Sequence, residues 1–226
     1  MKRSEINARI SDAVDFLATQ NFRLPPFAFW GPAEWAGRGP EADEIRVCRL
    51  GWDLTDFGAD DFDHKGLLLF TVRNGNAADP SNQKDYAEKV MIVEEDQVTP
   101  WHFHGAKMED IINRGGGNLV IELANSDGDG GLADTEVTVC TDGVRRTVPA
   151  RGTVTLSPGE SITLTQGLAH QFYAEAGRGR VLAGEVSSVN DDETDNYFID
   201  PAGRFPVIEE DEEPLYLLCT EYPPAN

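Results

Sequence analysis

The sequence predicts a mainly β protein, an antiparallel sandwich or barrel preceded by a helical segment. Many short runs rich in β-branched residues are separated by glycine and proline, and no helical pattern lies between them. The 226 residues are 40% hydrophobic, which is enough for one sizeable core. We expect a single domain over residues 1–226, with a helix and an irregular wrap in residues 1–44. A β-barrel core with acidic C-terminal loops is expected in residues 45–226.

The first segment has the periodicity of an amphipathic helix. Ile6 and Ile10 begin an apolar stripe at helical spacing, and Ser4 is the expected N-cap. Residues 25–40 are rich in proline, glycine and aromatic side chains. This composition predicts an irregular, packed wrap in which Trp35 lies on one short helix.

The strand runs follow from about residue 45. The clearest pair is a hairpin, because Asp142 and Gly143 supply the two residues with positive φ that a type I′ turn requires. Strands are expected at residues 46–50, 67–72, 86–94, 118–123, 136–140, 144–148, 161–165, 181–186 and 215–219. Strands that alternate with turns rather than helices favour antiparallel sheets.

Charge and cysteine content exclude several classes of function. Forty acidic residues against nineteen basic ones give a net charge of −21. Nucleic-acid surfaces and anionic membranes both require clustered Lys and Arg, so neither is an expected partner. The three cysteines have no CxxC spacing, which is typical of reduced thiols. We find no secretion signal or apolar run of membrane-spanning length and expect a soluble cytoplasmic protein with a solvated acidic loop at residues 209–213.

Three of the four histidines fall in two short segments, which indicates a shared role in a histidine-poor chain. In a strand, His102 and His104 point to the same face, with Cα atoms roughly 7 Å apart. Gly105 lets the chain turn, so that Glu109 can return a carboxylate to the same ion, and His170 follows a second glycine turn. Asp110 is the rival carboxylate, but the side chain of Glu109 reaches further.

Three imidazoles and one carboxylate form a mixed nitrogen and oxygen donor set. Such a set suits Mn, Fe, Co, Ni or Zn and suits Ca or Mg poorly. A lone histidine in a strand is more often structural, yet the clustering favours ligation. The sequence therefore predicts a metal site made of His102, His104, Glu109 and His170.

The two histidine segments resemble the two cupin motifs. Residues 102–109 match the first motif, and residues 159–170 match the second. The leading glycine of the first motif is Asp96 here, and the second motif has Thr165 in place of proline and Ala174 in place of asparagine. These departures affect turn positions and leave the ligands in place. The resemblance implies a cupin, an antiparallel barrel or jelly roll.

The resemblance to the D-lyxose isomerase family covers nearly the whole chain. It is carried by LPPFA at 24–28, LGWD at 50–53, LFTVRNG at 69–75, YAEK at 86–89, EDIINRGGGN at 109–118, SPGES at 157–161 and GEVSSVNDD at 184–192. The family implies an aldose–ketose isomerase that interconverts D-lyxose and D-xylulose and accepts D-mannose and D-fructose. It also implies a homodimer and Mn²⁺ as the metal, with Co²⁺, Fe²⁺, Ni²⁺ or Zn²⁺ as alternatives.

Aldose–ketose isomerisation moves a proton between C1 and C2, so it requires acid/base groups beside the metal. Lys107 lies inside the metal motif, and Glu185 ends an apolar strand where an inward carboxylate is costly unless used. We expect these two residues to be catalytic. Burial and a nearby cation are expected to lower the pKa of Lys107, although the same lysine in solvent would have no role.

Four further residues are expected to hold the sugar, namely Lys89, Asp192, Asp195 and Arg204. The alternation of its strand would equally place Lys89 on the outer face. Two other functions fit the ligand set, a metal-dependent cupin oxygenase and a non-catalytic sugar-binding cupin. An acid/base pair beside the metal favours the isomerase over both.

Overall fold

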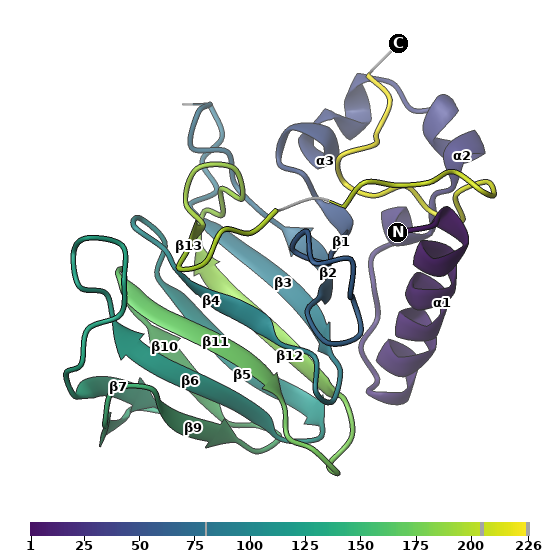
Figure 1. Cartoon of the computed structure of the whole chain (residues 1–226). Coiled ribbons are helices and arrows are strands. Elements are labelled where there is room, and N and C mark those ends of the chain that lie inside the picture. The colour runs from purple at the N-terminus through teal and green to yellow at the C-terminus, as the bar shows by residue number, and fades with distance from the viewer. Residues whose placement is uncertain (80, 204–205, 225–226) are drawn as a thin grey trace.

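Two antiparallel β-sheets make up most of the molecule, which confirms the predicted mainly β fold (Figure 1). The computed structural model describes residues 1–79, 81–203 and 206–224. The sheets lie face to face, and helix α1 (Arg3–Thr19) stands against the outer side of the larger sheet (Figure 1). This arrangement is a sandwich with one helical flank.

The described residues contain thirteen strands, and neighbouring strands within each sheet are antiparallel. The larger sheet has the spatial order β1 (Gly51–Thr55), β2 (Leu67–Arg73), β3 (Tyr86–Val93), β12 (Val181–Ser188), β5 (Glu109–Gly116), β10 (Ser161–Leu164), β7 (Val137–Thr141) and β8 (Val144–Val148). The smaller sheet has the order β13 (Tyr197–Phe198), β4 (Thr99–Phe103), β11 (Leu168–Ala174), β6 (Leu119–Asn125) and β9 (Gly152–Leu156).

The main core lies between the two sheets. Alternate residues of each strand point inward, as the two-residue period of a strand requires. Leu119, Ile121 and Leu123 on β6 are fully buried, and they share this core with Ile111 of β5 and Phe172 of β11. Some inward-facing positions are polar instead of apolar, and these form the site described below.

A second core joins α1 to the outer face of the larger sheet. Ile6 and Ile10 of the helix are fully buried against a cluster that contains Trp52 and Phe70. The helix begins earlier than expected, because Lys2 is its N-cap and the backbone N–H of Lys2 donates to the carboxylate of Glu5.

Ser4 therefore lies inside α1 and is not the N-cap. Its hydroxyl donates to Asp211 at 2.7 Å, within the acidic run at residues 209–213. That run is a loop, as expected, but it also binds the helix. Arg3 is almost fully buried and forms a bidentate pair with Glu210 and a further pair with Glu221. The C-terminal loop thus fastens the start of α1 to the body of the fold.

Four short helices precede the sheets, η1 (Pro26–Phe29), α2 (Pro32–Ala36), η2 (Pro40–Ala42) and α3 (Asp43–Val47). The short helix predicted around Trp35 is confirmed. The strand predicted at residues 46–50 is wrong, because acidic residues open a helical turn there and Arg46 donates to the carbonyls of Gly39 and Arg38.

The predicted hairpin is confirmed, with positive φ at both Asp142 and Gly143. The strand predicted at residues 215–219 is wrong. Only an isolated bridge forms there, between Leu218 and Trp52 of the edge strand β1, and Leu218 packs into the core that joins α1 to the sheet.

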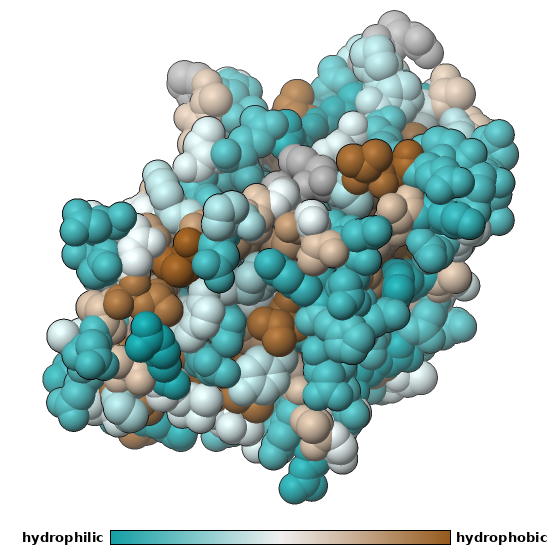
Figure 2. Space-filling model, viewed as in Figure 1, coloured by the Kyte–Doolittle hydropathy of each residue, from teal (hydrophilic) through white to brown (hydrophobic). Residues whose placement is uncertain are grey.

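The surface agrees with the charged composition, since hydrophilic residues cover most of the face in Figure 2. Within the described residues, none of the helices combines the length and the apolar character that crossing a membrane requires. All three cysteines are free thiols, and two of them, Cys48 and Cys219, are buried.

Candidate metal centre and active site

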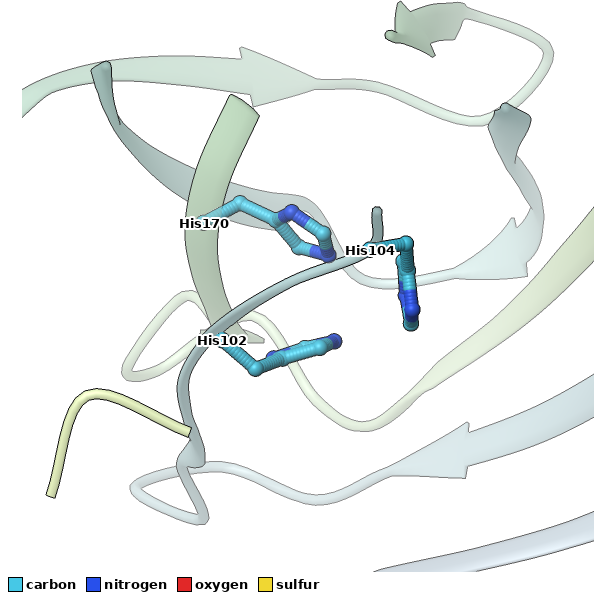
Figure 3. A group of neighbouring side chains, drawn as sticks. All are labelled: His102, His104 and His170. Atoms are coloured by element: carbon cyan, nitrogen blue, oxygen red, sulfur yellow. The ribbon is translucent and has the colours of Figure 1, made fainter. Parts of the chain in front are cut away.

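Three histidines from two neighbouring strands meet between the sheets. His102 lies on β4, and His104 follows at the end of that strand. His170 lies on β11, where it is the register partner of His102. The nearest ring nitrogens of the three side chains all lie within 4.8 Å of one another, and Figure 3 shows the rings directed toward a common point. The predicted convergence of His102 and His104 is confirmed, and His170 joins them.

Backbone carbonyls fix the orientation of each imidazole. Nδ1 of His102 lies 2.8 Å from the oxygen of Pro100, and Nδ1 of His104 lies 2.7 Å from the oxygen of Asp195. Nδ1 of His170 lies 3.0 Å from the oxygen of Leu168. A carbonyl accepts only, so Nδ1 carries the proton in each ring and Nε2 presents its lone pair to the centre.

Burial keeps the ring of His102 neutral. It holds the pKa of His102 well below its ordinary value, and the two neighbouring imidazoles lower that pKa further. A neutral imidazole with a free Nε2 lone pair is the form that binds a metal.

Glu109 supplies a carboxylate from the opposite sheet, at the start of β5. Its Oε1 lies 3.2 Å from Nε2 of His170 and 3.5 Å from Nε2 of His104. These facing atoms are all hydrogen-bond acceptors. Oε1 of Glu109 and Nε2 of His170 are buried and have no hydrogen-bond partner among the described residues.

Buried acceptors that converge without a donor need a cation between them. The three histidines could therefore hold a metal ion, and the carboxylate of Glu109 faces two of them. Asp110, the rival to Glu109, is the next residue on β5 and lies on the opposite face of the strand.

Lys107 lies between two carboxylates beside this cluster. Its Nζ is 2.7 Å from Oε2 of Glu109 and 2.9 Å from Oε1 of Glu185. Both strands that carry these carboxylates belong to the larger sheet, and all three side chains are almost fully buried. Lys107 and Glu185, the two predicted catalytic residues, are thus in direct contact.

Lys107 and Glu185 each stabilise the charged form of the other side chain. Burial disfavours the ammonium of Lys107, but Glu109 and Glu185 outweigh it and raise the pKa of Lys107. The expectation of a lowered pKa is therefore wrong, because the sequence did not reveal two carboxylates within hydrogen-bond distance. Burial favours the neutral acid of Glu185, yet Lys107 and Lys89 together lower its pKa.

Lys89 points inward, which resolves the ambiguity in its strand pattern. It is the register partner of Glu185 across β3 and β12, and its side chain is 4% exposed. Its Nζ lies 3.7 Å from Oε2 of Glu185 and 3.7 Å from Oδ1 of Asp192. Lys89 and Asp192, two of the predicted sugar-binding residues, therefore lie next to each other at the site.

Asn190 lies at the site and was missed by the sequence reasoning. Its Oδ1 accepts a hydrogen bond from Nζ of Lys89 at 2.6 Å and one from Nζ of Lys107 at 3.4 Å. Asn74 holds it in place, because the side chain of Asn74 donates to the carbonyl of Asn190 and accepts from its N–H, each at 3.0 Å. An isolated asparagine in a loop gives no pattern that could have revealed this role.

Asp195 is almost fully buried, but its carboxylate turns toward the backbone of residues 105–107. Arg204 lies outside the described residues. The pocket at the histidine cluster encloses a cavity of about 50 Å³ and opens to solvent on one side. Apolar side chains such as Phe57 and Phe198 line it beside the charged groups.

The fold and the site together define a cupin-type protein whose three-histidine group could hold a metal ion. The family model of D-lyxose isomerase matches residues 1–222. The chain therefore belongs to the D-lyxose isomerase family, and it is an enzyme of the aldose–ketose sugar isomerase class.

Relatives agree with this assignment. The chain is 52% identical over 223 residues to the D-lyxose/D-mannose isomerase of Serratia proteamaculans and 51% identical over 223 residues to that of Escherichia coli O157:H7. Each match covers 98% of both chains.

Solved structures share the fold at lower identity. The L-ribose isomerase of Cellulomonas parahominis with L-ribose superposes with a TM-score of 0.61 at 17% identity, over 92% of this chain and 98% of that chain. The L-ribose isomerase of Acinetobacter sp. DL28 in complex with L-ribose gives 0.62 at 15% identity, with the same coverage. These similarities establish the cupin-type architecture.

Proposed function

We propose that the protein is a metal-dependent isomerase that interconverts D-lyxose with D-xylulose, and D-mannose with D-fructose. One observation carries the proposal: three imidazole nitrogens converge, and the carboxylate of Glu109 faces them, beside the buried pair of Lys107 and Glu185. The names of the two relatives at about half identity support both substrates. D-Lyxose and D-mannose have the same configuration at C2, C3 and C4, so one pocket can present the same reacting carbons of each sugar.

Mn²⁺ is the metal we propose, with Co²⁺, Fe²⁺, Ni²⁺ or Zn²⁺ as substitutes that the same nitrogen and oxygen donors accept. His102, His104, Glu109 and His170 would hold it. A divalent ion there would supply Lewis-acid stabilisation of the negative charge that develops on the sugar oxygens.

Glu185 and Lys107 have complementary roles in the proposal. The carboxylate of Glu185 takes the proton from C2 of the aldose and returns it to C1 on the same face, through a cis-enediol intermediate. The ammonium of Lys107 is a donor aimed into the same space, and it moves a proton to or from the adjacent hydroxyl oxygen. Their contact at 2.9 Å keeps base and acid in opposite charge states before the sugar binds.

Lys89 and Asp192 bind the sugar hydroxyls in this account. Both line the pocket, Nζ of Lys89 lies 3.7 Å from the carboxylate of Glu185, and Asn190 fixes the direction of Lys89. An ammonium and a carboxylate provide a donor and an acceptor for neighbouring hydroxyl groups. Arg204, from the same C-terminal part of the chain, is proposed as a further sugar contact.

We also propose a single domain, a homodimer and a location in the cytoplasm. The continuous packing of α1 on the larger sheet supports one domain. Free cysteines suit a reducing compartment.

Isomerisation of D-lyxose under nitrogen with Mn²⁺ tests the proposal, since a cupin oxygenase with the same ligands would require O₂. We expect D-xylulose to form at the same rate with and without oxygen, and D-fructose to form from D-mannose. A strict requirement for O₂ would identify an oxygenase, and sugar binding without turnover would identify a non-catalytic cupin.

A further inference from the structure

Asp195 makes four hydrogen bonds to the segment that carries the site. Its Oδ1 accepts from the N–H groups of Gly105 and Ala106 at 2.8 and 2.9 Å, and its Oδ2 accepts from the N–H of Lys107 at 2.9 Å. Its own main-chain carbonyl accepts from Nδ1 of His104 at 2.7 Å. One residue, ninety positions away from Gly105 in sequence, therefore accepts hydrogen bonds from three successive backbone N–H groups and from one imidazole.

The turn that Asp195 engages joins β4 to β5 and bears three site residues. His104 precedes it, Lys107 ends it and Glu109 follows on β5. Three successive N–H groups that point at one carboxylate form a concave anion site in the backbone. Without the carboxylate, the buried N–H of Lys107 would be left without a partner, and the turn between His104 and Lys107 would no longer be fixed.

Asp195 is itself held rigidly. Its N–H donates to the carbonyl of Asp191 at 3.1 Å, which closes a turn before β13. On the other side, Tyr197 of β13 pairs with Phe103 of β4, and the two rings stack with centroids 5.1 Å apart. The carboxylate is thus presented from a segment that is anchored to the strand carrying the histidines.

We propose that Asp195 is a positioning residue for the metal centre rather than a sugar ligand. It fixes the 105–107 turn, sets the tautomer and direction of His104, and holds Lys107 toward Glu185. Both of its carboxylate oxygens are directed at the backbone, which leaves the sugar to Lys89 and Asp192. The inference rests on the metal site of the proposed function.

Asp195→Asn and Asp195→Ala test the inference through two readouts that do not depend on turnover. The asparagine keeps the shape of the side chain but places an NH₂ group against an N–H donor, and the alanine removes both carboxylate oxygens and with them all three hydrogen bonds to the turn. We expect amide hydrogen exchange in residues 105–107 to accelerate at least about tenfold in the chelator-treated protein. We expect the Kd for Mn²⁺, titrated directly, to rise about 10- to 100-fold.

Glu193→Gln is the matched control, because Glu193 is exposed in the same turn and pairs with Arg49 at the surface. It should leave both readouts unchanged. Unaltered exchange or an unaltered Kd in Asp195→Asn would overturn the proposal, and a raised KM for D-lyxose with an unaltered Kd would make Asp195 a sugar ligand instead. A wild-type protein that lacks isomerase activity would overturn the proposed function alone, because the exchange measurement does not need it.

Discussion

Lys107 and Glu185 form a buried ion pair, with Nζ and Oε1 2.9 Å apart, at the floor of a pocket whose wall holds three imidazoles. Burying two charges has a large desolvation penalty, and the attraction within a single ion pair often does not offset it. Here Glu109 and Asn190 add further hydrogen bonds to the ammonium, and Ser187 donates to Oε1 of Glu185 at 2.9 Å. A polar network of this cost, placed beside a predicted metal site, indicates function more than stability.

Replacing Glu185 with glutamine should lower kcat by about 10²-fold or more, because the amide cannot take a proton from C2. Mn²⁺ binding should be retained, since Glu185 is not among the four ligands. Steady-state kinetics with D-lyxose and a direct Mn²⁺ titration measure the two quantities. Glu88→Gln, at a carboxylate that pairs with the half-exposed Arg73, is the matched control and should keep wild-type kcat. Equal kcat values for the two variants would show that Glu185 is not the catalytic base.

Lys107→Met should destabilise the fold by about 3–5 kcal/mol, because it leaves Glu109 and Glu185 buried without their main counterion. Urea unfolding at neutral pH measures this change in the free energy of unfolding. Lys84→Met, which removes an ammonium that pairs with exposed Glu44, should change it by less than about 1 kcal/mol. A loss for Lys107→Met as small as that of the control would show that the buried pair is not as tightly coupled as its distance indicates.

The pH dependence of stability should also change in Lys107→Met. In the wild type the pKa of Glu185 is lowered on folding, so its contribution is present above the unfolded pKa of about 4.3 and is lost as pH falls. Without Lys107, burial dominates and raises that pKa, so the variant loses stability as pH rises. The stability gap between variant and wild type should therefore widen from pH 5 to pH 8. A gap that is constant with pH would contradict this account.

Proton transfer through Glu185 predicts exchange with solvent. Isomerisation of D-lyxose in D₂O should place measurable deuterium at C1 of D-xylulose, detected by NMR. Product without any deuterium would favour a hydride shift, for which Glu185 is not required as a base.

Arg3→Met should lower the free energy of unfolding by about 2–4 kcal/mol, because charged hydrogen bonds to Glu210 and Glu221 are lost together at a buried site. This corresponds to a fall in Tm of about 5–15 °C for a chain of this length. Arg178→Met, at an exposed pair with Glu175, is the control and should leave Tm nearly unchanged. A similar small effect in both would show that the C-terminal loop does not hold α1.

The convergence of the histidines could be predicted because a strand fixes which side chains share a face. The spacing of His102 and His104 determines their convergence, whatever the rest of the chain does. Hairpin chemistry is equally local, which explains why Asp142 and Gly143 were correctly read. The segment at residues 46–50 was predicted wrongly, because its apolar residues are compatible with either a helix or a strand. The hydrogen bonds from Arg46 to the carbonyls of residues 38 and 39 favour the helix.

The contacts of Lys107, Asn190 and Asp195 around the histidines could not be predicted, because they depend on strand register and on loop conformation. The pKa of Lys107 follows from where β12 places Glu185 relative to β5, and that register has no signal in composition. Asn190 and Asp195 act through backbone and lysine contacts that form only after the segment before β13 has folded onto β4.

Removal and return of the metal tests the central claim most directly. The wild type and His102→Ala are treated with EDTA, dialysed, and assayed for D-lyxose isomerisation before and after addition of Mn²⁺. The account predicts that the treated wild type is inactive and recovers with Mn²⁺, with weaker recovery from Co²⁺ or Zn²⁺, and that His102→Ala stays inactive throughout. Full activity of the EDTA-treated wild type, or of His102→Ala, would contradict it.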